Sequence, residues 1–116
     1  MSKYTDVLKT ADIKDGEMRE INVAGQEILI GRAGEDYYAA GNRCPHMGAK
    51  LAEGTLEGRI VTCPRHGSQF DLSDGKVVRW LKGSGLFSAV GKALKSPKPL
   101  VTYNVKVEDN AIFVEI

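Results

Sequence analysis

Two short stretches of the sequence each contain a cysteine followed directly by proline, with a histidine and a glycine close behind. They are RCPHMG, from Arg43 to Gly48, and TCPRHGSQFD, from Thr62 to Asp71, and together they hold both cysteines and both histidines of the chain. Proline fixes φ and removes a backbone donor, so neither stretch can wind into a helix. Glycine permits a positive φ and lets backbone N–H groups approach a bound group closely. The sequence therefore predicts two stiff, matched loops that contribute to one site.

The four side chains follow the spacing Cys44-x-His46-x16-Cys63-x2-His66. Two thiolates and two imidazoles suit zinc or iron–sulfur chemistry. Structural zinc sites usually draw like ligands from one segment, whereas here each loop supplies one cysteine and one histidine. The pattern favours an iron–sulfur cluster, with three alternatives. These are a zinc site, a Cys44–Cys63 disulfide, which a reducing cytoplasm disfavours, and a catalytic Cys–His pair, which would leave the duplicated loop unexplained.

Strand-like segments separated by turn signals fill most of the chain. With 116 residues the chain is long enough for one domain with a modest core, and its 13 glycines favour many tight turns. We expect strands over residues 17–23, 27–32, 37–40 and 59–62, and a closing hairpin formed by 102–107 and 111–116. The prediction is an all-β domain of residues 1–116, a small antiparallel barrel or sandwich. We expect its core to contain Ile28, Ile30, Ile60, Val105 and Ile112.

Charge and hydropathy narrow the functional class. The net charge is only +1, which gives no reason to expect nucleic-acid binding. Residues 1–18 contain neither the apolar stretch of a secretory signal nor a twin arginine, and no segment approaches membrane-spanning length. We therefore expect a cytoplasmic protein with no transmembrane segment.

One segment, residues 80–98 (WLKGSGLFSAVGKALKSPK), interrupts the strand pattern. Leu86, Val90 and Leu94 recur at helical spacing, which predicts a short amphipathic helix near residues 84–96. The stretch from Gly75 to Val107 contains no acidic residue but many lysines and arginines, so charge is concentrated there. The segment is interpreted as a docking surface for an acidic redox partner or an anionic membrane surface. The alternative is a solvated insertion that covers one end of the barrel.

The residues of the two loops, CPHMG and TCPRHGSQFDLSDG, closely resemble the cluster-binding loops of the Rieske iron–sulfur family. The resemblance extends over the chain outside residues 80–98. It implies one [2Fe–2S] cluster per chain, with one iron held by the thiolates of Cys44 and Cys63 and the other by the imidazoles of His46 and His66. It also implies a Rieske-type antiparallel β-sandwich or barrel in which residues 42–72 form a cluster-binding subdomain of two loops.

Within that family the chain is similar to the soluble Rieske ferredoxins. Subunits of membrane complexes have an extra cysteine in each loop, and in the second loop this chain has Arg65 at that position. The resemblance implies an electron-transfer protein rather than an enzyme, passing electrons from a flavin reductase to a terminal oxygenase or reductase. The alternatives are a tightly bound electron-transfer subunit, such as the small subunit of a nitrite reductase, and a zinc-stabilised interaction module without a redox role.

We predict a negative midpoint potential, in the lower part of the Rieske range of about −150 to +300 mV. The second loop of membrane-complex subunits often holds a serine and a tyrosine that hydrogen-bond the cluster. This chain keeps Ser68 but has Phe70 at the tyrosine-like position. Fewer hydrogen bonds to sulfur lower the potential. Redox titration at neutral pH measures it, and a clearly positive midpoint would contradict this prediction.

Overall fold

The fold is built almost entirely from short antiparallel strands. The computed structural model describes residues 4–44, 48–65, 67–79 and 99–116. The helix expected near residues 84–96 lies outside them. None of the helices formed by the described residues is long and apolar enough to span a membrane. In chain order the elements are β1 (Tyr4–Lys9), η1 (Thr10–Asp12), β2 (Met18–Val23), β3 (Gln26–Ala33), β4 (Asp36–Gly41), η2 (Leu51–Glu53), β5 (Thr55–Glu57), β6 (Ile60–Thr62), β7 (Gln69–Asp71), β8 (Val77–Arg79), β9 (Thr102–Tyr103), β10 (Val105–Glu108) and β11 (Ala111–Glu115), where η marks a 3₁₀ turn.

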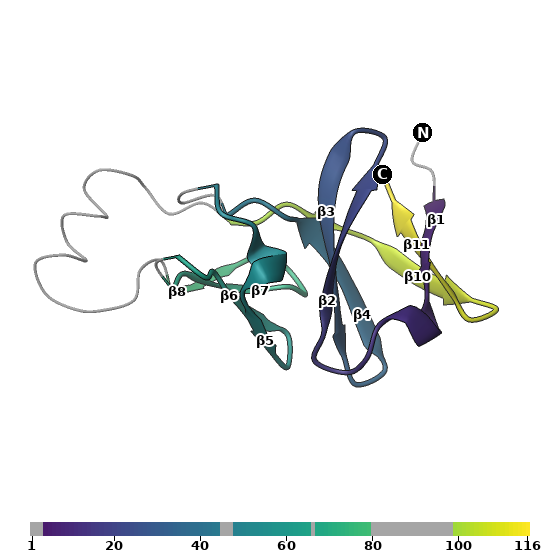
Figure 1. Cartoon of the computed structure of the whole chain (residues 1–116), viewed down its shortest axis with the longest axis horizontal. Helices are drawn as coiled ribbons and strands as arrows, with labels where there is room; N and C mark the ends of the chain where they lie inside the picture. The colour runs from purple at the N-terminus through teal and green to yellow at the C-terminus, as the bar shows by residue number, and fades with distance from the viewer. Residues whose placement is uncertain (1–3, 45–47, 66, 80–98) are drawn as a thin grey trace, which may run out of the picture.

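The strands form three sheets that follow one another across the molecule (Figure 1). The terminal sheet has the order β1-β11-β10, the central sheet β2-β3-β4-β9, and the cysteine-loop sheet β5-β6-β7-β8. The cysteine-loop sheet lies on one side of the central strands, and both chain termini lie on the other side, beside the terminal sheet (Figure 1). The all-β architecture expected from the turn pattern is confirmed.

The strand β3, in the middle of the central sheet, is buried on both faces, and its sequence carries the signature of this arrangement. Ile28, Leu29 and Ile30 are consecutive in β3, and all three are fully buried. Side chains alternate between the two faces of a strand. Ile28 and Ile30 therefore join a core with Ile112 of the terminal sheet, whereas Leu29 joins a second core that includes both cysteines. The central sheet thus supports the terminal sheet on one face and the cysteine loops on the other.

The predicted strand over residues 102–107 is divided at Asn104. Thr102 and Tyr103 pair with β4, whereas Val105 begins the pairing with β11. The Asn104 carbonyl accepts a hydrogen bond from the Glu115 N–H at 2.9 Å, and its side-chain amide donates to Glu115 Oε1 at 2.7 Å. These two hydrogen bonds join Asn104 to β11 at the position where the chain passes from the central sheet to the terminal sheet.

The expected core is confirmed in part. Ile28, Ile30 and Ile112 are fully buried. Ile60 and Val105 are only partly buried. Each is the first residue of a short strand, Ile60 of β6 and Val105 of β10.

The cysteine-loop sheet is tied to the returning chain at Gly75. The Leu100 N–H donates to the Gly75 carbonyl at 2.8 Å, and the Gly75 N–H donates to the Asp71 carbonyl at 2.7 Å. Gly75 has a φ of +79°, and a Cβ atom at this position would collide with the Leu100 carbonyl oxygen. The chain after residue 99 can approach the sheet this closely only because residue 75 is glycine.

We predict that Gly75→Ala destabilises the protein more than Gly16→Ala. Both residues have a φ near +80°, but a Cβ at Gly16 would have no atom within 4 Å. Each substitution brings the strain of a positive φ, about 1–2 kcal/mol, and only Gly75→Ala adds a backbone collision. Thermal unfolding measures the difference, since 1 kcal/mol shifts Tm by roughly 2–8 °C in domains of this size. Equal Tm values for the two variants would contradict the close approach at Leu100.

Candidate metal centre

The first cysteine loop, from Cys44 to Ala49, connects β4 to the turn η2. The Cys44 N–H donates to the Ala49 carbonyl at 2.8 Å, and the Gly48 N–H donates back to the Cys44 carbonyl at 2.7 Å. Gly48 has a φ of +74°, the left-handed conformation that glycine adopts without strain. These bonds close a tight loop with the cysteine at its base, where the Cys44 side chain is buried.

The second cysteine loop, from Cys63 to Ser68, connects β6 to β7 and repeats this geometry. The Cys63 N–H donates to the Ser68 carbonyl at 2.7 Å, and the Gly67 N–H donates to the Cys63 carbonyl at 3.2 Å. Gly67 has the same φ of +74°. The two loops therefore share one backbone design, as expected from the matching positions of cysteine, proline and glycine.

The two cysteines lie in a single buried cluster of side chains. They form no disulfide with each other, so the disulfide considered from the sequence is not present. They share the cluster with apolar residues from the central sheet, the turn η2 and the cysteine-loop sheet: Leu29, Ala40, Leu51, Val61, Phe70, Leu72 and Leu100. Two soft sulfur donors on equivalent loops, shielded from water on their inner side, fit the thiolate half of a mixed Cys/His iron–sulfur site.

The two histidines of the predicted ligand set, His46 and His66, lie outside the described residues. In the second loop, the residues directly before and after His66, Arg65 and Gly67, are described. Their part in the site therefore stays a prediction from the sequence.

Asn42 supports the first loop, a role that was not predicted from the sequence. Its side chain is fully buried. Its amide Nδ2 donates to Glu20 Oε1 of β2 at 2.7 Å, and its Oδ1 accepts from the Ala52 N–H of η2 at 2.9 Å. A buried amide of this kind is costly to leave unpaired, so Asn42 fixes η2 against the central sheet directly before Arg43 and Cys44. The only signal in the sequence is an isolated asparagine at the end of a strand, which is more often part of a turn.

Two carboxylates beside the loops are held in their ionised form. Hydrogen bonds from Arg43 to Glu27, at 2.6 and 3.1 Å, lower the pKa of the Glu27 carboxyl, against desolvation that raises it. Burial raises the pKa of Asp71, but hydrogen bonds from Ser73 and Arg59 outweigh it, and the pKa lies below its usual value. Both ion pairs therefore persist at neutral pH.

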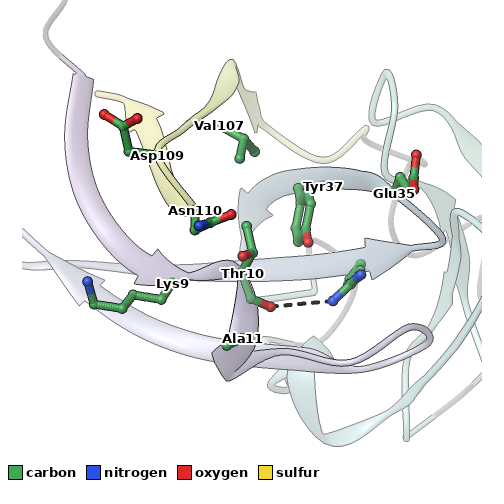
Figure 2. Close-up of a pocket in the computed structure, with 9 residues that line it drawn as sticks. Lys9, Thr10, Ala11, Glu35, Tyr37, Val107, Asp109 and Asn110 are labelled. Atoms are coloured by element: carbon green, nitrogen blue, oxygen red, sulfur yellow. Dashed lines mark hydrogen bonds between the residues drawn. The ribbon is translucent and has the colours of Figure 1, made fainter.

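A separate open cavity lies between the turn η1 and the hairpins β3–β4 and β10–β11 (Figure 2). The Arg32 guanidinium in its wall donates to the Thr10 and Ile13 carbonyls at 3.3 and 2.7 Å and lies 5.2 Å from the centre of the Tyr37 ring. Neither cysteine lines this cavity. Arg32 thus fastens η1 to the central sheet, and the cavity is no part of the metal centre.

Comparison with known proteins agrees with the geometry of the loops. The family model for the Rieske [2Fe–2S] domain matches residues 3–99. The ferredoxin component of the naphthalene 1,2-dioxygenase/salicylate 5-hydroxylase systems of Ralstonia sp. is 32% identical over 115 residues, which cover 97% of this chain and 95% of that protein.

Two solved structures are similar over nearly their whole length. The ferredoxin of carbazole 1,9a-dioxygenase from Nocardioides aromaticivorans IC177 has a TM-score of 0.80 and 25% identity, with 97% of this chain and 96% of that chain covered. A chain in a complex of reduced oxygenase and oxidised ferredoxin in carbazole 1,9a-dioxygenase has a TM-score of 0.76 and 28% identity, with 95% and 99% covered.

These matches decide between the readings of the Cys/His spacing that the sequence left open. They favour an iron–sulfur cluster over zinc and over a catalytic cysteine, and an electron-transfer protein over an enzyme. With its two matched cysteine loops on a β-sheet scaffold, the chain belongs to the Rieske [2Fe–2S] domain family and carries a [2Fe–2S] cluster.

Proposed function

We propose that Cys44, His46, Cys63 and His66 hold one [2Fe–2S] cluster, the cysteines on one iron and the histidines on the other. The support is the equivalence of the two loops, which give each cysteine the same backbone hydrogen bonds and the same buried position. The whole chain, residues 1–116, then acts as a single domain, with its cluster-binding part at residues 42–72.

We infer that the chain is the ferredoxin component of an oxygenase system. It carries electrons one at a time from a flavin reductase to a terminal oxygenase. The observation that carries this function is a match along almost the full length of both chains to ferredoxin components of dioxygenase systems. The solved complex of a similar ferredoxin with its oxygenase illustrates the second half of the route. The cytoplasm is the proposed location, because Cys44 and Cys63 form no disulfide, as is usual for cysteines of a reducing compartment.

A bound Rieske cluster would accept and release one electron. The residues around the two cysteines determine how much water and how many hydrogen-bond donors reach its sulfur atoms. Val61, Phe70 and Leu72 exclude water from the sulfur side. Phe70 is fully buried and has no hydroxyl group to donate, consistent with a low potential. The stiff loops reduce the rearrangement that accompanies each electron.

A permanently bound subunit would use the same cluster but would not exchange between partners. Weak electron-transfer complexes have small interfaces and dissociate readily. A carrier therefore elutes separately from its oxygenase in size-exclusion chromatography at micromolar concentration, whereas a permanent subunit co-elutes with its partner.

We predict that the reduced protein passes its electron to the terminal oxygenase of a naphthalene or carbazole dioxygenase. The protein is reduced with dithionite, desalted and mixed anaerobically with the oxidised oxygenase, and reoxidation is followed by visible absorbance. Because weak electron-transfer complexes bury small interfaces, we expect measurable transfer, at a rate below that of the oxygenase's own ferredoxin. Cys63→Ser protein, which lacks a proposed ligand, is the control and should transfer no electron. A loaded protein that reduces neither oxygenase, under conditions in which both native ferredoxins do, would contradict the function.

A further inference from the structure

We propose that Arg43 and Arg79 are paired positioning residues that clamp the two cysteine loops, and that the charge of Arg79 also raises the cluster's reduction potential. The inference rests on the proposed ligand set, since it assigns roles to residues that contact the two loops. Neither arginine lies within the two cysteine loops. Arg43 directly precedes the first cysteine, and Arg79 is the last residue of β8.

Arg79 holds the second loop from the neighbouring strand. It ends β8, where it pairs with Gln69 of β7. Its guanidinium donates twice to the Gly67 carbonyl, from Nε at 3.1 Å and from Nη2 at 2.9 Å. The peptide unit is planar, so anchoring the Gly67 carbonyl also fixes the direction of the Ser68 N–H. Arg79 therefore sets the orientation of a peptide group in the loop that carries Cys63.

Arg43 makes the corresponding contact in the first loop. Its Nη1 donates to the Gly48 carbonyl at 3.1 Å. Gly48 and Gly67 are equivalent positions, each four residues after its cysteine and each with a φ of +74°. An arginine from outside each loop thus binds the same carbonyl in both loops.

The two arginines differ in the charge that surrounds them. Arg43 Nε and Nη2 form a two-point ion pair with the Glu27 carboxylate, at 2.6 and 3.1 Å. The ion pairs found within residues 4–44, 48–65, 67–79 and 99–116 do not include Arg79. The charge of Arg43 is therefore neutralised locally, whereas Arg79 forms no ion pair with a described carboxylate.

This difference matters for an electron carrier. With two thiolates and two neutral imidazoles, the oxidised site carries no net charge, and the arriving electron gives it one negative charge. A cation nearby favours the negatively charged state, and a partly buried guanidinium is screened less by water and salt than an exposed one. The part-buried Arg79 should therefore favour the reduced form more than the exposed and neutralised Arg43.

The test compares four variants of the cluster-loaded protein: Arg79→Gln, Arg79→Lys, Arg43→Gln and Arg19→Gln. Arg19 is an exposed residue of β2 in the central sheet and controls for the loss of one positive charge. Two quantities are measured, the midpoint potential by redox titration and the rate of cluster loss in urea by visible absorbance. EPR of each reduced variant establishes that the ligand set is unchanged, which separates a failure of this inference from a failure of the ligand assignment.

We expect Arg79→Gln to lower the equilibrium constant for reduction by about threefold to tenfold, where tenfold corresponds to about 59 mV for one electron. Arg79→Lys should keep most of the potential but lose its cluster faster, because an ammonium cannot reproduce the two-point contact. Arg43→Gln should accelerate cluster loss with a smaller change in potential, and Arg19→Gln should change neither quantity. An unchanged potential in Arg79→Gln would overturn the proposal. Should that variant fail to load a cluster, cluster loss from Arg79→Lys at the wild-type rate would overturn it instead.

Discussion

Each cysteine loop is closed by the same pair of backbone hydrogen bonds, and the rest of the structure serves to hold these two closures side by side. In each loop the cysteine N–H donates to the carbonyl five residues later, and the glycine N–H donates back to the cysteine carbonyl. Gly48 and Gly67 both have a φ of +74°, which other residues adopt only with strain. The hydrogen bonds fix the two ends of each loop, the cysteine and the residues four and five positions after it, relative to one another.

The central sheet brings the two loops to one place. Leu29 and Ala40 present one face of this sheet to the cysteines, while Ile28 and Ile30 pack the other face against the terminal sheet. The cysteine-loop sheet is short. Among the described residues, the sheet and the turn η2 before it are held to the remainder by the shared core, the hydrogen bonds of Asn42 with Glu20 and η2, the Lys50–Glu20 ion pair, and the bond between Gly75 and Leu100. Changes at these attachments should therefore alter the cluster site without altering its ligands.

The sequence predicted the features that depend on local chemistry. Proline and glycine around Cys44 and Cys63 indicated matched loops, and short alternating segments indicated an all-β fold. Features that depend on distant partners were missed. The strand Tyr4–Lys9 is an edge strand with half of its residues exposed and none fully buried, so its hydrophobic pattern is weak, and it is held by its pairing with β11. The change of sheets at Asn104 and the roles of Asn42, Arg43 and Arg79 likewise depend on residues far away in the chain, which no local pattern reveals.

EPR of the dithionite-reduced protein tests the proposed ligand set of two cysteines and two histidines. Imidazole ligands on one iron change the electronic structure of a [2Fe–2S] cluster relative to four thiolates, as they change its potential. We predict a rhombic signal whose average g value lies below that of all-cysteine ferredoxins, and loss of this signal in Cys44→Ser and Cys63→Ser proteins. A colourless, EPR-silent protein with one zinc ion per chain would contradict both the ligand set and the electron-transfer function.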